Sequence, residues 1–425
     1  MIKGNPVAFV DRRNVLTVPL SAGAAAALVL LCLAPTAAAG DDQSTVYHHV
    51  GTVTEPAVSA IAAGVTPTNP TGRFASFDIS WVDSARHAYY LADRSNNAVD
   101  VVDTTDGSFV MFLGHGAFAG VISGSPNRSG PNGVVTDDDG NVWVGDGLIG
   151  GVGHSSLKAF NPTTGVMIAN INNGGVARAD ELAFGRTGDG RILITNPNEP
   201  TTAFVTLVNT RTRTILAQVM YDAGTSATGV PPAGHGFNTN FGGSQHGLEQ
   251  PVFLNGKFYL NVPATVQNMG GELDVFDPNT GVITAVLPLS TCGGTGLAVL
   301  PRHQLLVECG DSARILDTHG NELVRFPVFG ASDQIWFNPG DGRAYFSLVP
   351  NAALRPGALA GLGVLDVANR RSLGITPVAG AQGLHSIAAD AHNNRIFMPS
   401  SDNPDNGGGG IAMMHAAQQE HESDD

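Results

Sequence analysis

Short runs of apolar residues, separated by turn-forming residues, cover most of the chain. In one unit after another, an apolar run is followed by a turn containing Asp, Gly or Asn and by a second run that ends in Asp, Asn or Pro. A loop then leads to a third run that ends near Asp-x-x-Thr or Asp-x-x-Gly. The runs are alternating or wholly apolar, and turns recur at the spacing of about 8–12 residues that is typical of all-β proteins.

This pattern occurs seven times, in units that start near residues 77, 132, 181, 249, 295, 333 and 385. A four-strand unit that recurs every 40–65 residues or so indicates a β-propeller. We therefore predict an all-β fold over residues 74–415 with seven four-stranded blades, or six if one unit is irregular. The seventh unit stops after three runs. The N-terminal segment, residues 40–73, contains the runs VYHHVGTV and AVSAIAA, which could supply the missing strand and close the ring.

Two stretches resemble repeats of known propellers. YYLADRSNNAVDVVDT (residues 89–104) is similar to the YVTN-type repeat of bacterial exported propellers, and PNGVVTDDDGNVWVGD (131–146) resembles repeats of the NHL and gluconolactonase/regucalcin propellers. At the level of the repeat, the resemblance covers nearly all of residues 74–415. It implies the propeller fold and leaves the chemistry open, because these propellers include binding modules, lactonases and lyases.

Polar residues open the first strand of every unit: Asp78, Asn132, Glu181, Glu249, Thr295, Asp333 and His385. The first strand of each propeller blade lies innermost and all of them run the same way, so we expect these side chains to meet at one mouth of the central channel. Carboxylates gathered there would repel one another. A bound cation, raised pKa values or water in a wide mouth can relieve that repulsion.

An oxygen-rich ring with one amide suits Ca²⁺ or Mg²⁺, and a contribution from His385 or His246 would shift the preference toward Zn²⁺, Mn²⁺ or Fe. The resemblance to gluconolactonase implies that Asn132, Glu181 and Asp333 hold a divalent ion. Glu249 and Asp78 are further candidate ligands. The alternative is that these side chains bond the backbone of neighbouring loops or line a wet channel.

Two functions are consistent with this mouth. The first is a metal-dependent hydrolase or lyase that acts on a small molecule such as a lactone or ester, with His385 or His246 as general base. The second is a non-catalytic propeller that binds a protein or glycan through its long loops, in which case any ion is structural.

The first 39 residues predict an export signal peptide. Arg12 and Arg13 precede an apolar run, and Ala37-Ala38-Ala39 offers a cleavage site. Both a Sec signal and a twin-arginine signal fit, and either predicts a periplasmic or extracellular protein. Cleavage removes three cationic residues and one acidic residue, which takes the formal net charge from −15 to −17. Such a charge disfavours nucleic acid and anionic lipid as partners.

Three smaller expectations complete the sequence analysis. No apolar stretch after the signal reaches the ~20 residues of a membrane span. Cys292 and Cys309 are the only cysteines left after cleavage, and strand pairing would place them close enough for a disulfide. Residues 416–425 are expected to form a disordered acidic tail.

Overall fold

The computed structural model describes residues 47–53, 55, 75–200, 202–221, 247–265, 268–350, 360–378, 383–401 and 409–416. All of them belong to the compact unit 44–425. The predicted export signal, the run AVSAIAA and residues 417–425 of the predicted tail lie outside the described residues.

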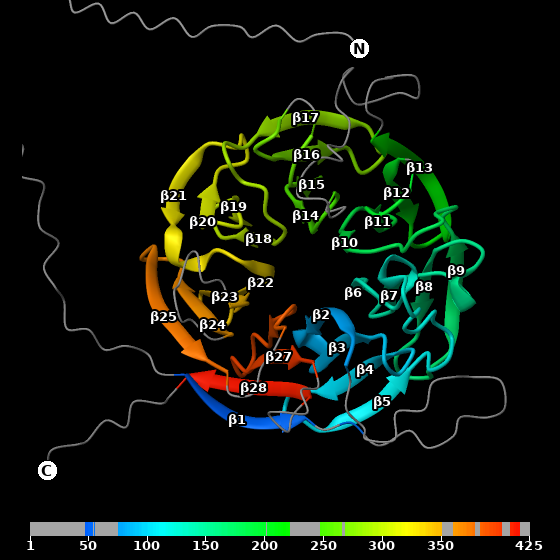
Figure 1. Ribbon diagram of the computed structural model, residues 1–425, viewed down its shortest axis with the longest axis horizontal. Coiled ribbons are helices and arrows are strands. Elements are labelled where there is room, and N and C mark those ends of the chain that lie inside the picture. Colours follow the sequence, from blue (N-terminus) through cyan, green and yellow to red (C-terminus); the bar gives the residue numbers. More distant parts are fainter. Residues whose placement is uncertain are drawn as a thin grey trace, which may run out of the picture. The chain divides into compact units, whose positions relative to one another are not determined.

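Seven four-stranded antiparallel sheets are arranged as blades around a central axis (Figure 1). In six blades each strand pairs with the next along the chain, so these blades are meanders from the axis outwards; in the seventh, β1 takes the outer place. Blades 1 to 4 are formed by β2 (Phe77–Asp83), β3 (Ala88–Asp93), β4 (Ala98–Asp103) and β5 (Phe109–Leu113); β6 (Val134–Thr136), β7 (Val142–Asp146), β8 (Ser156–Phe160) and β9 (Met167–Asn172); β10 (Leu182–Gly185), β11 (Arg191–Asn196), β12 (Ala203–Asn209) and β13 (Thr214–Tyr221); and β14 (Pro251–Leu254), β15 (Lys257–Val262), β16 (Glu272–Phe276) and β17 (Ile283–Pro288).

The remaining blades follow the same plan. They are formed by β18 (Leu297–Leu300), β19 (Gln304–Glu308), β20 (Ala313–Leu316) and β21 (Glu322–Phe326); β22 (Ser332–Asn338), β23 (Arg343–Leu348), β24 (Gly361–Asp366) and β25 (Arg371–Pro377); and β26 (Ala388–Ala389), β27 (Ile396–Ser400), β28 (Gly410–Ala416) and β1 (Tyr47–Val53). Among the described connections, four contain a short 3₁₀ helix: η1 (Ser84–Arg86), η2 (Pro126–Arg128), η3 (Ile149–Gly151) and η4 (Pro327–Phe329). In the described part of the chain, no helix is long and apolar enough to span a bilayer.

The N-terminal strand closes the ring. β1 pairs antiparallel with β28, with Tyr47 opposite Ala416 and Val53 opposite Ile411, and it forms the outer strand of the seventh blade (Figure 1). This confirms seven blades and the closing role predicted for the run VYHHVGTV. In the closed ring every blade packs between two others, so no blade presents an uncovered sheet face to solvent.

The apolar pattern of each strand follows from its place in the blade. The second strands are flanked by blades on both faces, so β11 and most of β15 are buried throughout. Leu193 of β11 packs in one cluster with Phe258 and Leu260 of β15. Outer strands such as β13 and β21 have one face toward solvent, so exposed and more buried side chains alternate along much of their length. Complete burial of a Leu or Phe side chain contributes about 1.5–3 kcal/mol, so these layers between blades supply most of the stability.

A tight hairpin turn at Asn255 and Gly256 joins β14 to β15. Leu254 and Lys257 pair across the turn, and Asn255 and Gly256 have φ values of 52° and 75°. Two consecutive positive φ values are those of a type I′ turn, which Asn-Gly adopts at low cost.

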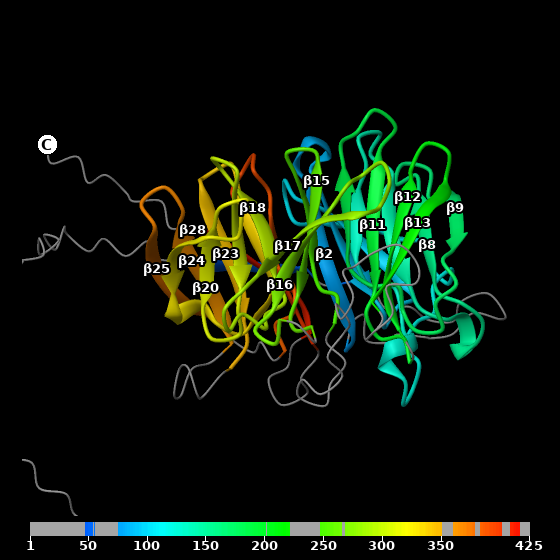
Figure 2. The ribbon, with the colours of Figure 1, turned by 90° about the horizontal axis from the view of Figure 1, so that it is seen from above.

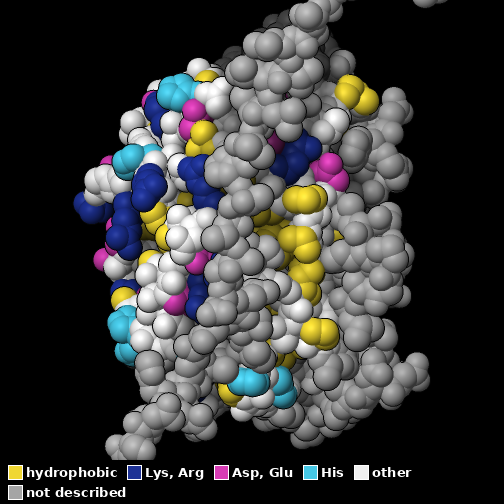
Figure 3. All heavy atoms as spheres, turned by 90° about the vertical axis from the view of Figure 1, so that its left-hand side faces the viewer, with side chains coloured by type: hydrophobic (Ala, Val, Ile, Leu, Met, Phe, Trp, Pro, Cys, Tyr) yellow, Lys and Arg dark blue, Asp and Glu magenta, His cyan; other side chains and the backbone are white. Residues whose placement is uncertain are grey.

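The outer side of the ring near β21 and β25 carries interspersed basic and acidic side chains (Figure 3). On β21, for example, Arg325 bonds Glu322 at 2.9 Å. This surface therefore has mixed charge, as expected of a solvated face.

A disulfide joins Cys292, before β18, to Cys309, directly after β19. Both cysteines are buried and 17 residues apart in sequence.

We predict that the double variant Cys292→Ser/Cys309→Ser lowers the free energy of unfolding by about 2–3 kcal/mol, because the bridge restricts the unfolded chain. Urea unfolding of oxidised wild type and the double variant measures this; identical midpoints would contradict it.

Candidate functional site

The seven polar residues that open the inner strands lie at one end of the channel. Antiparallel meanders place the start of every first strand on the same face of the ring, and the strands run across its thickness (Figure 2). Asp78 and Asp333 lie in β2 and β22, and Glu181 directly precedes β10. The others stand within three residues of their strands. We call this end of the channel the mouth.

His385 links blades 1 and 6 across the mouth. Its Nε2 lies 2.7 Å from Asp78 Oδ1, and its Nδ1 lies 2.8 Å from Asp333 Oδ2. Burial by itself would lower the pKa of His385, but the charges of Asp333 and Asp78 outweigh it and hold that pKa well above its usual value. His385 is therefore a doubly hydrogen-bonded imidazolium at neutral pH.

Arg94 is the counterion of Asp78. The guanidinium, 8% exposed, bonds Asp78 Oδ2 and donates from Nη2 and Nε to Asn132 Oδ1 at 2.7 and 3.1 Å. Asn132 in turn donates to the carbonyls of Ser129 and Ala179. Burial raises the pKa of Asp78, but Arg94 and His385 outweigh it, so the pKa lies below its usual range.

Arg178 forms a second positive centre. Its Nη2 lies 2.8 Å from Asp180 Oδ2 and its Nη1 lies 3.7 Å from Asp78 Oδ2. Burial raises the pKa of Asp180 to about 6, even though Arg178 acts in the opposite direction. Asp180 is consequently mostly ionised at pH 7.

Glu181 differs from its neighbours in having no described cationic partner. It is 6% exposed, and the charges that act on it most strongly are acidic, from Asp333, Glu249, Asp180 and Asp78. Burial, followed by these charges, holds the pKa of Glu181 well above its usual value. Burial and the charge of Asp333 also raise the pKa of Glu249 to about 8. Glu249 is thus predominantly protonated at neutral pH when nothing else neutralises it, and Glu181 holds its proton more tightly than an exposed glutamate does.

The structure brings together Asp78, Asn132, Glu181, Glu249, Asp333 and His385. Thr295 also lies there, donating to the carbonyls of Ser332 and Asp333. His246 lies outside the described residues. The sequence analysis missed Arg94 and Arg178 and therefore overestimated the repulsion. The sequence held a usable signal for Arg94. It directly follows the second strand of blade 1, and the end of that strand lies beside the start of the first strand.

Contacts in the structure bear on two predicted roles, which stay predictions. Both ring nitrogens of His385 are engaged by carboxylates, whose charges raise its pKa, and this favours a protonated ring over the general base predicted for it. The amide of Asn132 is engaged by Arg94 and by two backbone carbonyls. These contacts make Asn132 a support for Arg94 and do not favour the ligand role predicted for it.

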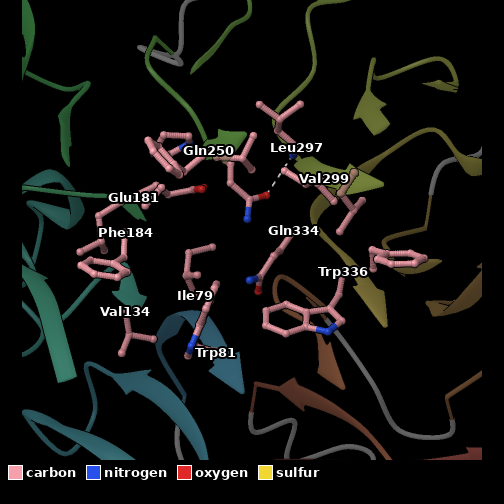
Figure 4. A pocket seen from close by; sticks show the side chains of 18 residues that line it. Ile79, Trp81, Val134, Glu181, Phe184, Gln250, Leu297, Val299, Gln334 and Trp336 are labelled. Atoms are coloured by element: carbon pink, nitrogen blue, oxygen red, sulfur yellow. Dashed lines mark hydrogen bonds between the residues drawn. The ribbon is translucent and has the colours of Figure 1, made fainter. Parts of the chain in front are cut away.

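An apolar cavity of about 230 Å³ lies directly next to the mouth. Figure 4 shows Glu181 directing its carboxyl group into this space, with Gln250 and Gln334 nearby and the rings of Trp81 and Trp336 further along. Gln250 accepts the Leu297 N–H at 3.0 Å, and the Gln334 amide donates to the Ser80 carbonyl at 2.8 Å. The channel therefore offers an acidic entrance above an apolar chamber.

The groups that come closest to joint metal coordination lie elsewhere. Among the described residues, two sets of three have donor atoms within 4.8 Å of one another: His87, Asp390 and His392, and Glu55, Asp93 and Asp100. The first set lies at the tight turns on the face opposite the mouth. The described acidic residues of the mouth do not form such a set.

Comparisons with known proteins show the fold alone. No protein-family model matches the chain, and no curated protein sequence matches it either. Among solved structures, the chain is similar to a chain in the crystal structure of a mitotic checkpoint complex, with a TM-score of 0.55 and 10% identity over 96% of this chain and 99% of that chain. The shared feature is a propeller. The resemblance to YVTN, NHL and gluconolactonase repeats is thus confirmed for the fold and stays a prediction for the family.

Proposed function

We propose that the mouth is the active site of an exported hydrolase or lyase that acts on a small molecule, with a divalent cation held by Glu181, Glu249 and Asp333. The observation that carries this proposal is the convergence of three carboxyl groups from three blades beside an apolar chamber, one of them buried without a cationic partner in the described chain. Cation binding would take the place of the protons that repulsion holds on Glu181 and Glu249.

The donor atoms are all carboxylate oxygens, which a hard cation prefers. The three carboxyl groups would have to move closer together than they stand in this structure to bind one ion. When bound, such an ion polarises a carbonyl or activates water. The chamber takes the apolar part of the substrate. Arg94 and Arg178 keep Asp78 and Asp180 ionised and in place. His385, held between two carboxylates, keeps Asp78 and Asp333 in place. Hydrolysis of a lactone or ester by the activated water would yield an alcohol and an acid.

We expect Glu181→Gln to lose the bound ion and to lower turnover at least ~100-fold, since one ligand and its charge disappear while shape is kept. The measurement is metal content of protein purified through its own export route, followed by a screen of lactones and esters. Glu322→Gln on the exposed strand β21 is the matched control and should keep both properties. Turnover that survives in metal-free wild type would contradict the proposal.

A second candidate is a non-catalytic protein-binding propeller. The solved structure to which this chain is similar is that of a protein complex. Three apolar side chains are exposed on loops of blade 2, namely Val121, Ile149 and Val152 at 52%, 53% and 73%. Apolar exposure of this kind is a feature of docking surfaces. An ion-free mouth, no turnover on any substrate and stable association with a partner through these loops would favour this function.

A further inference from the structure

A buried acidic cluster joins the two ends of the ring. Asp93 ends β3, Asp100 lies in β4, and Glu55 stands two residues beyond β1. Leu91 pairs with Asp100, so Asp93 and Asp100 lie diagonally on one face of blade 1. Leu91 on that face packs against Val53, Phe397 and Ile411 of blade 7. The cluster therefore lies in the layer between the first and last blades, where β1 closes the propeller.

The three carboxylates are almost completely removed from water. Asp93 and Asp100 are 0% exposed and Glu55 is 4% exposed. One oxygen atom of each lies within 4.8 Å of the other two. In the described chain no Lys, Arg or His forms an ion pair with any of them, because Arg94, the adjacent cation, is directed to Asp78. Three carboxylates in this position cannot all carry a charge without a neutralising group.

Asn96 provides a second, independent observation. It is 0% exposed, and its Nδ2 donates to Glu55 Oε2 at 3.1 Å and to Asp93 Oδ2. Its amide is therefore in direct contact with the cluster, yet its Oδ1 has no hydrogen-bond partner. Glu55 Oε1, Asp100 Oδ1 and Asp100 Oδ2 are also buried, and no described group outside the cluster donates to them; Asp100 is hydrogen-bonded through the carboxyl groups of Glu55 and Asp93.

Once the protons that the carboxyl groups share are removed, these atoms are all acceptors, and buried acceptors normally have a donor or an ion. One cation can satisfy several of them at once. A rotation of the Asn96 amide by half a turn exchanges its nitrogen and oxygen and turns Oδ1 toward Glu55 and Asp93. The pocket then offers the Asn96 oxygen, both oxygens of Glu55 and of Asp100, and Asp93 Oδ2. Ca²⁺ takes about 6–8 oxygens at about 2.3–2.6 Å, so ligands on opposite sides of it are about 5 Å apart. That separation matches the spacing of the cluster.

We propose that Glu55, Asp93, Asn96 and Asp100 form a structural calcium site that clamps the closed ring. The ion fastens the segment after β1 to blade 1, and so couples the strand that completes blade 7 to the blade beside it. This site is separate from the mouth and does not depend on the proposed enzymatic function. It belongs to the fold, and its loss should open the junction between blades 7 and 1.

The test uses the full exported chain, freed of metal with EGTA and titrated with CaCl₂. Binding is followed by calorimetry and by the midpoint of thermal unfolding. We expect the cluster to bind one calcium equivalent, in addition to any ion that the mouth takes up, with a rise in the midpoint. Asp100→Asn should lose that equivalent and the rise, whereas Glu181→Gln at the mouth should keep both. Asp106→Asn, an exposed carboxylate in the same blade, is the matched control.

Two results would overturn the site. If calcium leaves the unfolding midpoint of wild type unchanged, the cluster is neutralised by protons. If Asp100→Asn binds calcium as wild type does, the ion lies elsewhere. Because Asn keeps the shape of Asp and removes repulsion, the variant should fold in EGTA; its circular dichroism and its midpoint in EGTA establish this. Glu181→Gln keeps the two proposals apart. If this variant loses turnover but still binds calcium at the buried cluster, the calcium site stands independently of the active site proposed at the mouth.

Discussion

Replacing Arg94 by methionine lowers the free energy of unfolding by about 3–5 kcal/mol, the cost of removing one member of a buried ion pair. Methionine keeps most of the apolar contact but leaves Asp78, 2% exposed, without its main counterion. It also leaves the Asn132 oxygen without its donor. The measurement is equilibrium unfolding in urea at neutral pH.

The double variant Arg94→Met/Asp78→Asn is the control for this prediction. The amide that replaces the carboxylate of Asp78 carries no charge, so the double variant should recover a large part of the lost stability. Both variants should also alter the environment of His385, which bonds Asp78 at 2.7 Å. If Arg94→Met unfolds at the same urea concentration as wild type, the mouth is not neutralised by this pair.

Raising the pH from about 4.5 to 8 destabilises the protein through Glu308, at the end of β19. The carboxyl is 2% exposed, and burial raises its pKa to about 7, although the N–H groups of Gly310, Thr295 and Ala331 bond it and act in the opposite direction. The folded state therefore holds this proton more tightly than the unfolded chain, so the contribution is present at low pH and is lost as pH rises to about 7. Its size is about 3 kcal/mol.

Glu308→Gln isolates this contribution, because Gln does not titrate. The free energy of unfolding of wild type, minus that of the variant, should fall by about 3 kcal/mol between pH 4.5 and 8. Glu322→Gln on the exposed outer strand should shift by much less. Wild type and Glu308→Gln curves that run parallel over this range would show that Glu308 is already ionised at low pH.

The mouth shows how far a sequence can predict a site. The positions of Glu181, Glu249, Asp333 and His385 at a common entrance followed from the repeat, because register and strand direction are the same in every blade. The electrostatic state of that entrance did not follow. Arg94 reaches the entrance from the end of the second strand of blade 1, and Arg178 reaches it from the loop between blades 2 and 3. Neither arginine stands at a position that is repeated from blade to blade. Their effect on Asp78 and Asp180 depends on distances of a few ångströms.

The buried cluster beside β1 illustrates the same limit more sharply. Asp93, Asn96 and Asp100 lie in the stretch that resembles a YVTN repeat, where a turn and a strand end explain them locally. Glu55 is about 40 residues away, in a segment that contributes only one described residue to the site. Only closure of the ring brings it to the other three.

The sequence by itself determined the all-β class, the repeated four-strand unit and the N-terminal segment as the source of the last strand, because period and turn chemistry are local properties of the chain. It left six or seven blades open, and two runs as candidates for the closing strand. It also determined which residue types stand at the channel entrance. The tertiary structure decided which of them are charged, which are supported by arginine and where buried oxygens remain without donors. Those properties depend on burial and on distances between blades, and neither is encoded in the spacing of residues along a strand.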